Sequence, residues 1–67
     1  MKLVYTKTEL PVKAGDIVNG PCATKLTVTE WVEPARGADH PGHVYTKDAE
    51  GDVKRYFPRV FGMRWLP

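Results

Sequence analysis

Apolar residues recur along this chain at short, alternating spacing, and Gly or Pro interrupts every stretch long enough for an amphipathic α-helix. In residues 24–32, for example, Leu26 and Val28 have one parity and alternate with polar residues. Such alternation predicts a strand with one buried face and one solvated face. Glu30 and Trp31 reverse the alternation, so a β-bulge or bend is expected near Glu30.

The same pattern predicts further extended segments, separated by residues that favour turns. The strands are expected at residues 2–6, 16–19, 24–32, 43–47, 52–57 and 63–66. Residues 34–42 contain two prolines and show no periodicity, so they are expected to form the longest loop. Asp48–Gly51 is expected to form a hairpin turn. Pro58 can begin a single turn of 3₁₀-helix that Gly62 ends.

These elements predict an all-β fold, namely a small barrel of five to six short antiparallel strands with a 3₁₀ turn before the last strand. Strands this short leave unpaired edges unless the sheet closes on itself, which favours a barrel over an open sheet. The side chains expected to fill its core include Leu10, Val12 and Ile17 near the second strand, and Val53, Phe57, Met63 and Trp65 near the C-terminus.

The length of 67 residues predicts one domain, spanning residues 1–67. A domain of this size buries only about 60% of the surface that its unfolded chain exposes, which leaves little core from which to carve a polar cleft. We therefore expect a binding or structural protein rather than an enzyme, without a cofactor. Cys22 is the only cysteine and excludes an intramolecular disulfide, and the N-terminal residues have no long apolar run. A soluble cytoplasmic protein that does not enter a membrane is expected.

The formal net charge of +2 is small, but the charge is unevenly distributed. Residues 54–67 contain four cations and no acid, whereas acids outnumber cations in residues 34–53. Basic character is therefore concentrated at the C-terminal end.

Two segments resemble the SH3 domain family. Residues 9–16, Glu-Leu-Pro-Val-Lys-Ala-Gly-Asp, are similar to the diverging turn that leads SH3 domains into their second strand. Residues 56–61, Tyr-Phe-Pro-Arg-Val-Phe, are similar to the family's Tyr-Ile/Val-Pro-Ser-Asn-Tyr segment, in which a strand end is followed by a 3₁₀ turn. The two segments occur in the family's order, and the resemblance implies an SH3-like barrel.

The resemblance does not extend to the residues with which SH3 domains bind proline-rich peptides. Only Tyr5 matches the family's pair of tyrosines in the first strand, and Trp31 lies at the end of a strand rather than at the start. The chain is more loosely similar to bacterial SH3-like modules of the KOW type, and to small phage and prophage proteins. A phage or bacterial protein of unassigned role is the expectation from this likeness.

Several side chains are of types that form chemical sites. Asp39, His40 and His43, with Cys22, are residue types that bind transition metals, yet no paired cysteines accompany them. Solvated loop histidines and a small packed cysteine are the favoured explanation. No nucleophile with a recognisable partner base is present, so we expect no catalytic residue and no metal site.

Two binding surfaces remain as alternatives. The first is a protein-binding patch formed by Trp31, Tyr45 and Tyr56 beside the loop that contains Arg36. The opposing interpretation is that these aromatic residues fill the core. A protein partner is the favoured expectation, and the chain itself can be a monomer or a homodimer.

The second alternative is a nucleic-acid surface, because cations and aromatic residues interleave near the C-terminus. Its phosphate-binding residues would be Lys54, Arg55, Arg59 and Arg64. The low net charge argues against it.

Overall fold

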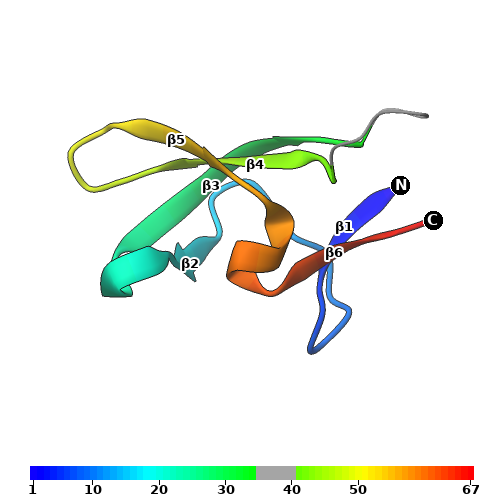
Figure 1. Ribbon diagram of the computed structural model, residues 1–67. Coiled ribbons are helices and arrows are strands. Elements are labelled where there is room, and N and C mark those ends of the chain that lie inside the picture. The colour runs from blue at the N-terminus through cyan, green and yellow to red at the C-terminus, as the bar shows by residue number, and fades with distance from the viewer. Residues whose placement is uncertain (35–40) are drawn as a thin grey trace.

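The computed structural model describes residues 1–34 and 41–67, with only the backbone described at Cys22. Its strands are β1 (Lys2–Tyr5), β2 (Ile17–Asn19), β3 (Lys25–Val32), β4 (His43–Lys47), β5 (Val53–Tyr56) and β6 (Met63–Leu66). Two 3₁₀ turns, η1 (Pro21–Ala23) and η2 (Pro58–Phe61), precede β3 and β6 (Figure 1). The described chain is therefore all-β, as expected, with a 3₁₀ turn before its last strand.

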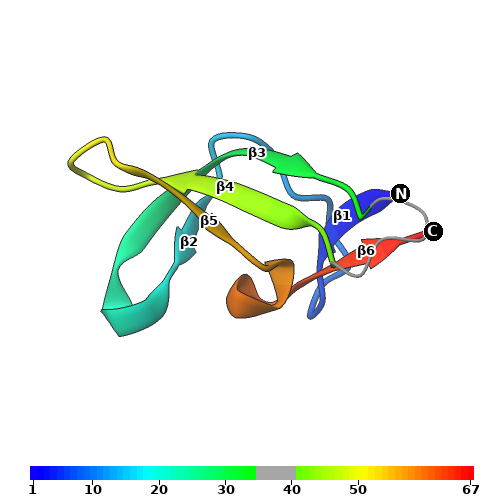
Figure 2. The same ribbon diagram turned by 45° about the horizontal axis from the view of Figure 1, so that its top comes forward.

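The six strands form two antiparallel sheets. One contains β1 and β6, and the other has the order β2-β3-β4-β5. Lys2 lies opposite Leu66 in the smaller sheet, so the two chain ends lie side by side (Figure 2). The expected single closed barrel is wrong in this respect, because neither sheet closes on itself.

On one side, residues 10–16 join the two sheets through backbone hydrogen bonds. Leu10 accepts a bond from the amide of Tyr5, and the amide of Val12 donates to Leu3, so this segment flanks β1. A few residues later, the amide of Gly15 donates to the carbonyl of Val28 in β3. We call this the closed side of the molecule.

A side-chain hydrogen bond reinforces the closed side. The hydroxyl of Tyr5 donates to Oδ2 of Asp16 over 2.7 Å, and the backbone amide of Lys13 donates to the same oxygen over 3.0 Å. The bonds from Lys13 and then Tyr5 lower the pKa of Asp16. Burial, followed by the bond to this carboxylate and its charge, raises the pKa of Tyr5 to about 12. Both shifts favour the protonation states that keep the bond at neutral pH.

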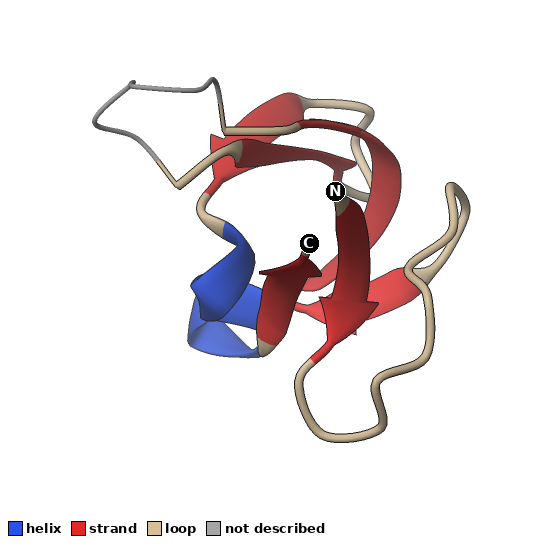
Figure 3. Ribbon diagram, turned by 90° about the vertical axis from the view of Figure 1, so that its right-hand side faces the viewer, coloured by secondary structure: helices blue, strands red, loops and turns tan. Residues whose placement is uncertain are grey.

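On the other side, β5 and β6 are not paired, and η2 lies between them in the chain. Proline cannot donate to a ladder, and Pro58 begins η2 directly after Phe57, which prevents β5 from continuing. Figure 3 shows η2 beside β6, with β1 on the other side of that strand. We call this the open side.

Trp65 spans the open side from β6 to the residues before β4. Its indole N–H donates to the carbonyl of Pro41. A Cβ at Gly42 would lie 2.8 Å from the ring and 2.7 Å from the carbonyl oxygen of Val32, and the φ of Gly42 is +83°. Glycine is required there because the indole rests on its backbone.

The core lies between the two sheets. Leu3, Val12, Val18, Leu26, Val28, Val44 and Met63 form one buried cluster, which confirms Val12 and Met63 as core residues. Tyr5, Trp31, Tyr56, Phe61 and Trp65 are partly buried against it.

Four residues expected in the core lie instead at the surface. Leu10 is 61% exposed, Ile17 69%, Val53 61% and Phe57 40%. Ile17 lies opposite Thr27 and Val53 opposite Lys47, so alternation places both on the outer face, away from buried Val28 and Thr46. At Ile17 and Val53 the alternation was predicted correctly, but the face was assigned wrongly. Leu10 is exposed although it has the same parity as buried Val12.

The expected strand positions are confirmed to within one residue at each end. The register between β3 and β4 shifts between Val28 and Glu30, which confirms the expected bulge. The turn η1 was not predicted, since Gly20-Pro21 was expected only to end the second strand.

Candidate functional site at the open side

Two hollows at the open side share Phe57 as a lining residue. Phe57 follows the last residue of β5 and precedes Pro58, whose ring restricts it to an extended backbone. This conformation, together with the alternation of β5, directs the side chain outward. The two hollows together are called the Phe57 surface.

The first hollow has a volume of about 230 Å³ and is mainly apolar. Its lining residues are Pro41, Phe57, Pro58, Arg59, Met63, Arg64 and Trp65. Because these residues come from β6, from η2 and from the segment before β4, the hollow exists only where the two sheets fail to pair. We call it the Trp65 hollow.

The second hollow has a volume of about 260 Å³ and shares Phe57 with the first. His43, Arg55, Tyr56, Phe57 and Val60 line it. Val60 is 43% exposed, so its apolar side chain is available to a ligand. We call this the Val60 hollow.

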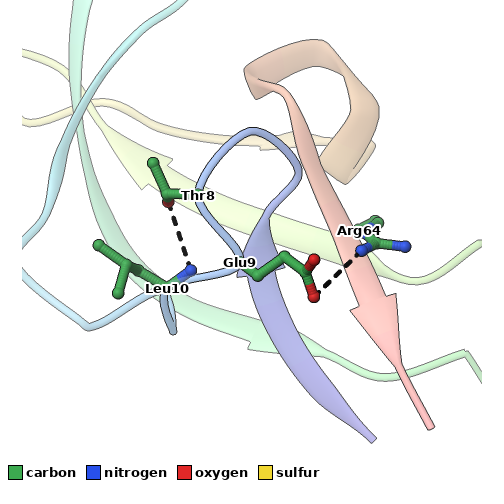
Figure 4. A network of polar contacts seen from close by, with 4 residues as sticks. All are labelled: Thr8, Glu9, Leu10 and Arg64. Carbon is green, nitrogen blue, oxygen red and sulfur yellow. Dashed lines mark hydrogen bonds and ion pairs between the residues drawn. The ribbon is translucent and has the colours of Figure 1, made fainter.

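Within the described part of the chain, three arginines and no carboxylate line the two hollows. Arg55 is in β5, Arg59 in η2 and Arg64 in β6. Arg64 also forms an ion pair with Glu9 over 3.4 Å, at an exposed position (Figure 4). The Phe57 surface therefore combines apolar walls with positive charge.

The ring of Phe57 has contacts within the molecule. His43 stacks with it at a centroid distance of 5.8 Å and an interplanar angle of 23°. The guanidinium carbon of Arg59 lies 5.8 Å from the ring centroid, a cation–π distance. These contacts fix the orientation of Phe57 at the junction of the hollows.

The aromatic patch expected from the sequence is divided between two faces of the larger sheet. Trp31 and Tyr56 both lie opposite Val44 and pack against the core. Tyr45 lies on the other face, between Glu30 and Arg55. Only Tyr56 lines one of the hollows.

The cations expected to bind nucleic acid are brought together in part. Arg55, Arg59 and Arg64 border the Phe57 surface. Lys54 lies opposite Thr46, and alternation along β5 directs its side chain to the other face from Arg55. Arg36, assigned to the protein-binding patch, lies outside the described residues.

Of the reactive residues considered as chemical sites, only His43 has a described side chain. Residues 1–34 and 41–67 contain no group of three His, Cys, Asp or Glu that could hold a metal. Asp39 and His40 lie outside these ranges, and Cys22 lies in η1.

The sequence interpretation missed the hollows because it treated Phe57 and Trp65 as ordinary core residues. One signal was available at Phe57, which has the same parity as Arg55 and Val53 on a strand that leaves an acidic hairpin turn. No local sequence pattern predicts the contact between Trp65 and Gly42, because these residues are far apart in the sequence.

Comparisons with protein-family models, curated proteins and solved structures found no match to this chain. In the described residues, no helix has the length and apolar character needed to cross a membrane. The geometry of the Phe57 surface is therefore the basis for assigning a function.

Proposed function

We propose that this chain is a small, non-enzymatic interaction module that binds a protein partner through the Phe57 surface. The observation that carries the proposal is the convergence of an exposed Phe57, two apolar hollows and three arginines at the open side. Apolar patches with a charged border are typical of protein interfaces.

The composition of the surface supports a protein partner. Arginine and large aromatic residues contribute most of the binding energy in measured interfaces, especially where they line a pocket. Each hollow is smaller than the roughly 300–1,000 Å³ of sites that enclose a drug-sized ligand. A hollow of about 230 Å³ suits one side chain of a partner.

We also infer that the chain has an SH3-like architecture. Support comes from the turn that precedes β2, the 3₁₀ turn η2 before β6, and the antiparallel pairing of β1 with β6. A phage or bacterial origin remains part of the proposal on the resemblance alone. A cytoplasmic location remains part of it on the single cysteine, Cys22.

A peptide selection tests the proposed function. A random peptide library displayed on phage is enriched against the wild-type protein and then tested against Phe57→Ser. We expect enriched peptides to lose binding to the variant, because Phe57 borders both hollows. The matched control is Val53→Ser, which removes an exposed apolar side chain from the same face but outside the hollows. Failure to enrich any peptide, or equal losses in both variants, would contradict the proposal.

Nucleic-acid binding is the second candidate, favoured by the placement of Arg55, Arg59 and Arg64 around one surface. Binding of oligothymidylate should then weaken steeply with salt, because phosphate contacts release counterions. Absence of retention at low salt would eliminate this candidate.

A further inference from the structure

We infer that the partner presents an extended, acidic peptide segment that contains one large apolar side chain. This inference rests on the proposed function and specifies what the Phe57 surface recognises. The apolar side chain occupies the Trp65 hollow, and the flanking carboxylates contact Arg55 and Arg59.

The Trp65 hollow accounts for the apolar residue. Five of its seven lining residues are Pro41, Phe57, Pro58, Met63 and Trp65, which offer carbon surface on several sides. Trp65 is held in place by its bond to Pro41 and its contact with Gly42. A preorganised pocket loses little conformational entropy when it is filled, which favours binding of a single side chain.

The arginines account for the acidic flanks. Among residues 1–34 and 41–67, no Asp or Glu lines either hollow, so Arg55 and Arg59 can pair with carboxylates supplied by a partner. Guanidinium groups form bidentate hydrogen bonds with carboxylates, which adds orientation to the charge attraction.

An edge of β5 accounts for the extended conformation. Among the described residues, β5 pairs only with β4, and β6 pairs only with β1. The other edge of β5 therefore has no neighbouring strand within those residues, whereas η2 lies beside the other edge of β6. Arg55 and Tyr56 of β5 line the Val60 hollow. An extended peptide can use such an edge for backbone hydrogen bonds.

The state of the aromatic rings favours a peptide over single-stranded nucleic acid. Base binding requires open ring faces on which bases stack. Phe57 already stacks with His43 and has Arg59 at cation–π distance, while Trp65 rests on Gly42. The neighbouring cation, Lys54, lies on the other face of β5, which interrupts a phosphate track.

Tryptophan fluorescence provides the test. Trp31 and Trp65 are the two tryptophans of the chain, so Trp31→Phe makes the emission specific for the hollow. The first probe is a synthetic peptide with one Phe flanked by Glu and Ser. The comparison probes replace Phe by Ser, replace every Glu by Lys, or are oligothymidylate.

We expect the Glu-flanked Phe peptide to change Trp65 emission and to bind about tenfold more weakly when its Phe or its Glu residues are replaced. Arg59→Glu should weaken binding by about tenfold. Lys54→Glu, which changes the net charge equally on the other face of β5, should alter it less than about twofold. Circular dichroism confirms that both variants are folded.

The inference is overturned if the Lys-flanked peptide binds as well, if oligothymidylate binds more tightly, if both charge variants weaken binding equally, or if no probe binds. The library selection separates this failure from failure of the proposed function. Enriched neutral or basic peptides that require Phe57 leave the proposed function standing and overturn only the acidic partner. A selection without enriched peptides contradicts both.

Discussion

The two sides on which the sheets meet differ in chemistry. At the closed side, backbone hydrogen bonds of residues 10–16 connect β1 with β3, and Tyr5 and Asp16 add a short side-chain bond. At the open side, Trp65 reaches across a gap without a ladder and leaves a hollow beside it.

This difference separates two tasks within one small domain. A ladder satisfies its own backbone groups and leaves little for a ligand, whereas a gap filled by side chains leaves strand edges and apolar walls accessible. We therefore expect the closed side to contribute mainly to stability. The open side depends on one aromatic contact for its shape and provides the binding surface.

Two glycines, one at each side, give the largest expected contrast. Gly42→Ala should lower the free energy of unfolding by about 3 kcal/mol, because a Cβ at positive φ also collides with Trp65 and a backbone carbonyl. Gly15→Ala should cost only about 1 kcal/mol, since its φ is +97° but no atom lies within 4 Å of the added Cβ. Urea unfolding of both variants measures the contrast. Equal losses would show that Trp65 does not hold the open side.

Loss of the Tyr5 hydroxyl tests the closed side. Tyr5→Phe should lower the free energy of unfolding by about 1 kcal/mol, because the 2.7 Å bond to Asp16 is lost while Asp16 keeps the Lys13 amide. Tyr56→Phe is the control, since no hydrogen bond of the Tyr56 hydroxyl is found in the described part of the chain. Thermal unfolding compares the two. If Tyr56→Phe lowered the free energy of unfolding more than Tyr5→Phe, the bond between Tyr5 and Asp16 would not be a main source of stability.

The closed side should also respond to pH at both extremes. The folded pKa of Asp16 is lowered from 3.8, so its stabilisation is complete above pH 3.8 and is lost as the pH falls through the lowered value. The folded pKa of Tyr5 is raised from 10.0 to about 12, so its stabilisation is complete below pH 10.0 and is lost as the pH rises toward 12.

Unfolding free energies across these two ranges check the pH dependence. Tyr5→Phe should abolish the alkaline loss and reduce the acidic one, because Asp16 then retains only its backbone bond. An unchanged alkaline loss in this variant would assign that titration to another group. Trp65 has no titratable atom, so the open side adds no pH dependence of its own through that residue.

The closed side was largely readable from the sequence, because its signals are local. The Ala14-Gly15-Asp16 turn, the strands around it and the bulge near Glu30 follow from alternation and turn residues a few positions apart. The location of the Tyr5 hydroxyl beside Asp16 was not predicted, because it depends on the path of the excursion between β1 and β2.

Except for η2, whose start at Pro58 was predicted, the open side could not be predicted from the sequence, because it depends on contacts between distant segments. Trp65 and Gly42 meet only after both sheets have formed, and Phe57 is exposed because η2 replaces a ladder after β5. Residue parity showed that Val53 and Phe57 share a face. Only the packing of Val44 and Thr46 shows which face is inside.

The smallest expected effect links the two sides through Glu9 and Arg64. Glu9→Gln should change the free energy of unfolding by less than about 0.5 kcal/mol, because this ion pair is exposed on both side chains. The same change releases Arg64, which lines the Trp65 hollow, and removes a negative charge near it. The Glu-flanked Phe peptide should then bind about twofold more tightly, most clearly at low salt. Lys7→Gln is the control, since its side chain lines neither hollow. Tighter peptide binding without a change in the free energy of unfolding would show that Glu9 lowers the positive charge available at the Trp65 hollow and contributes little to stability.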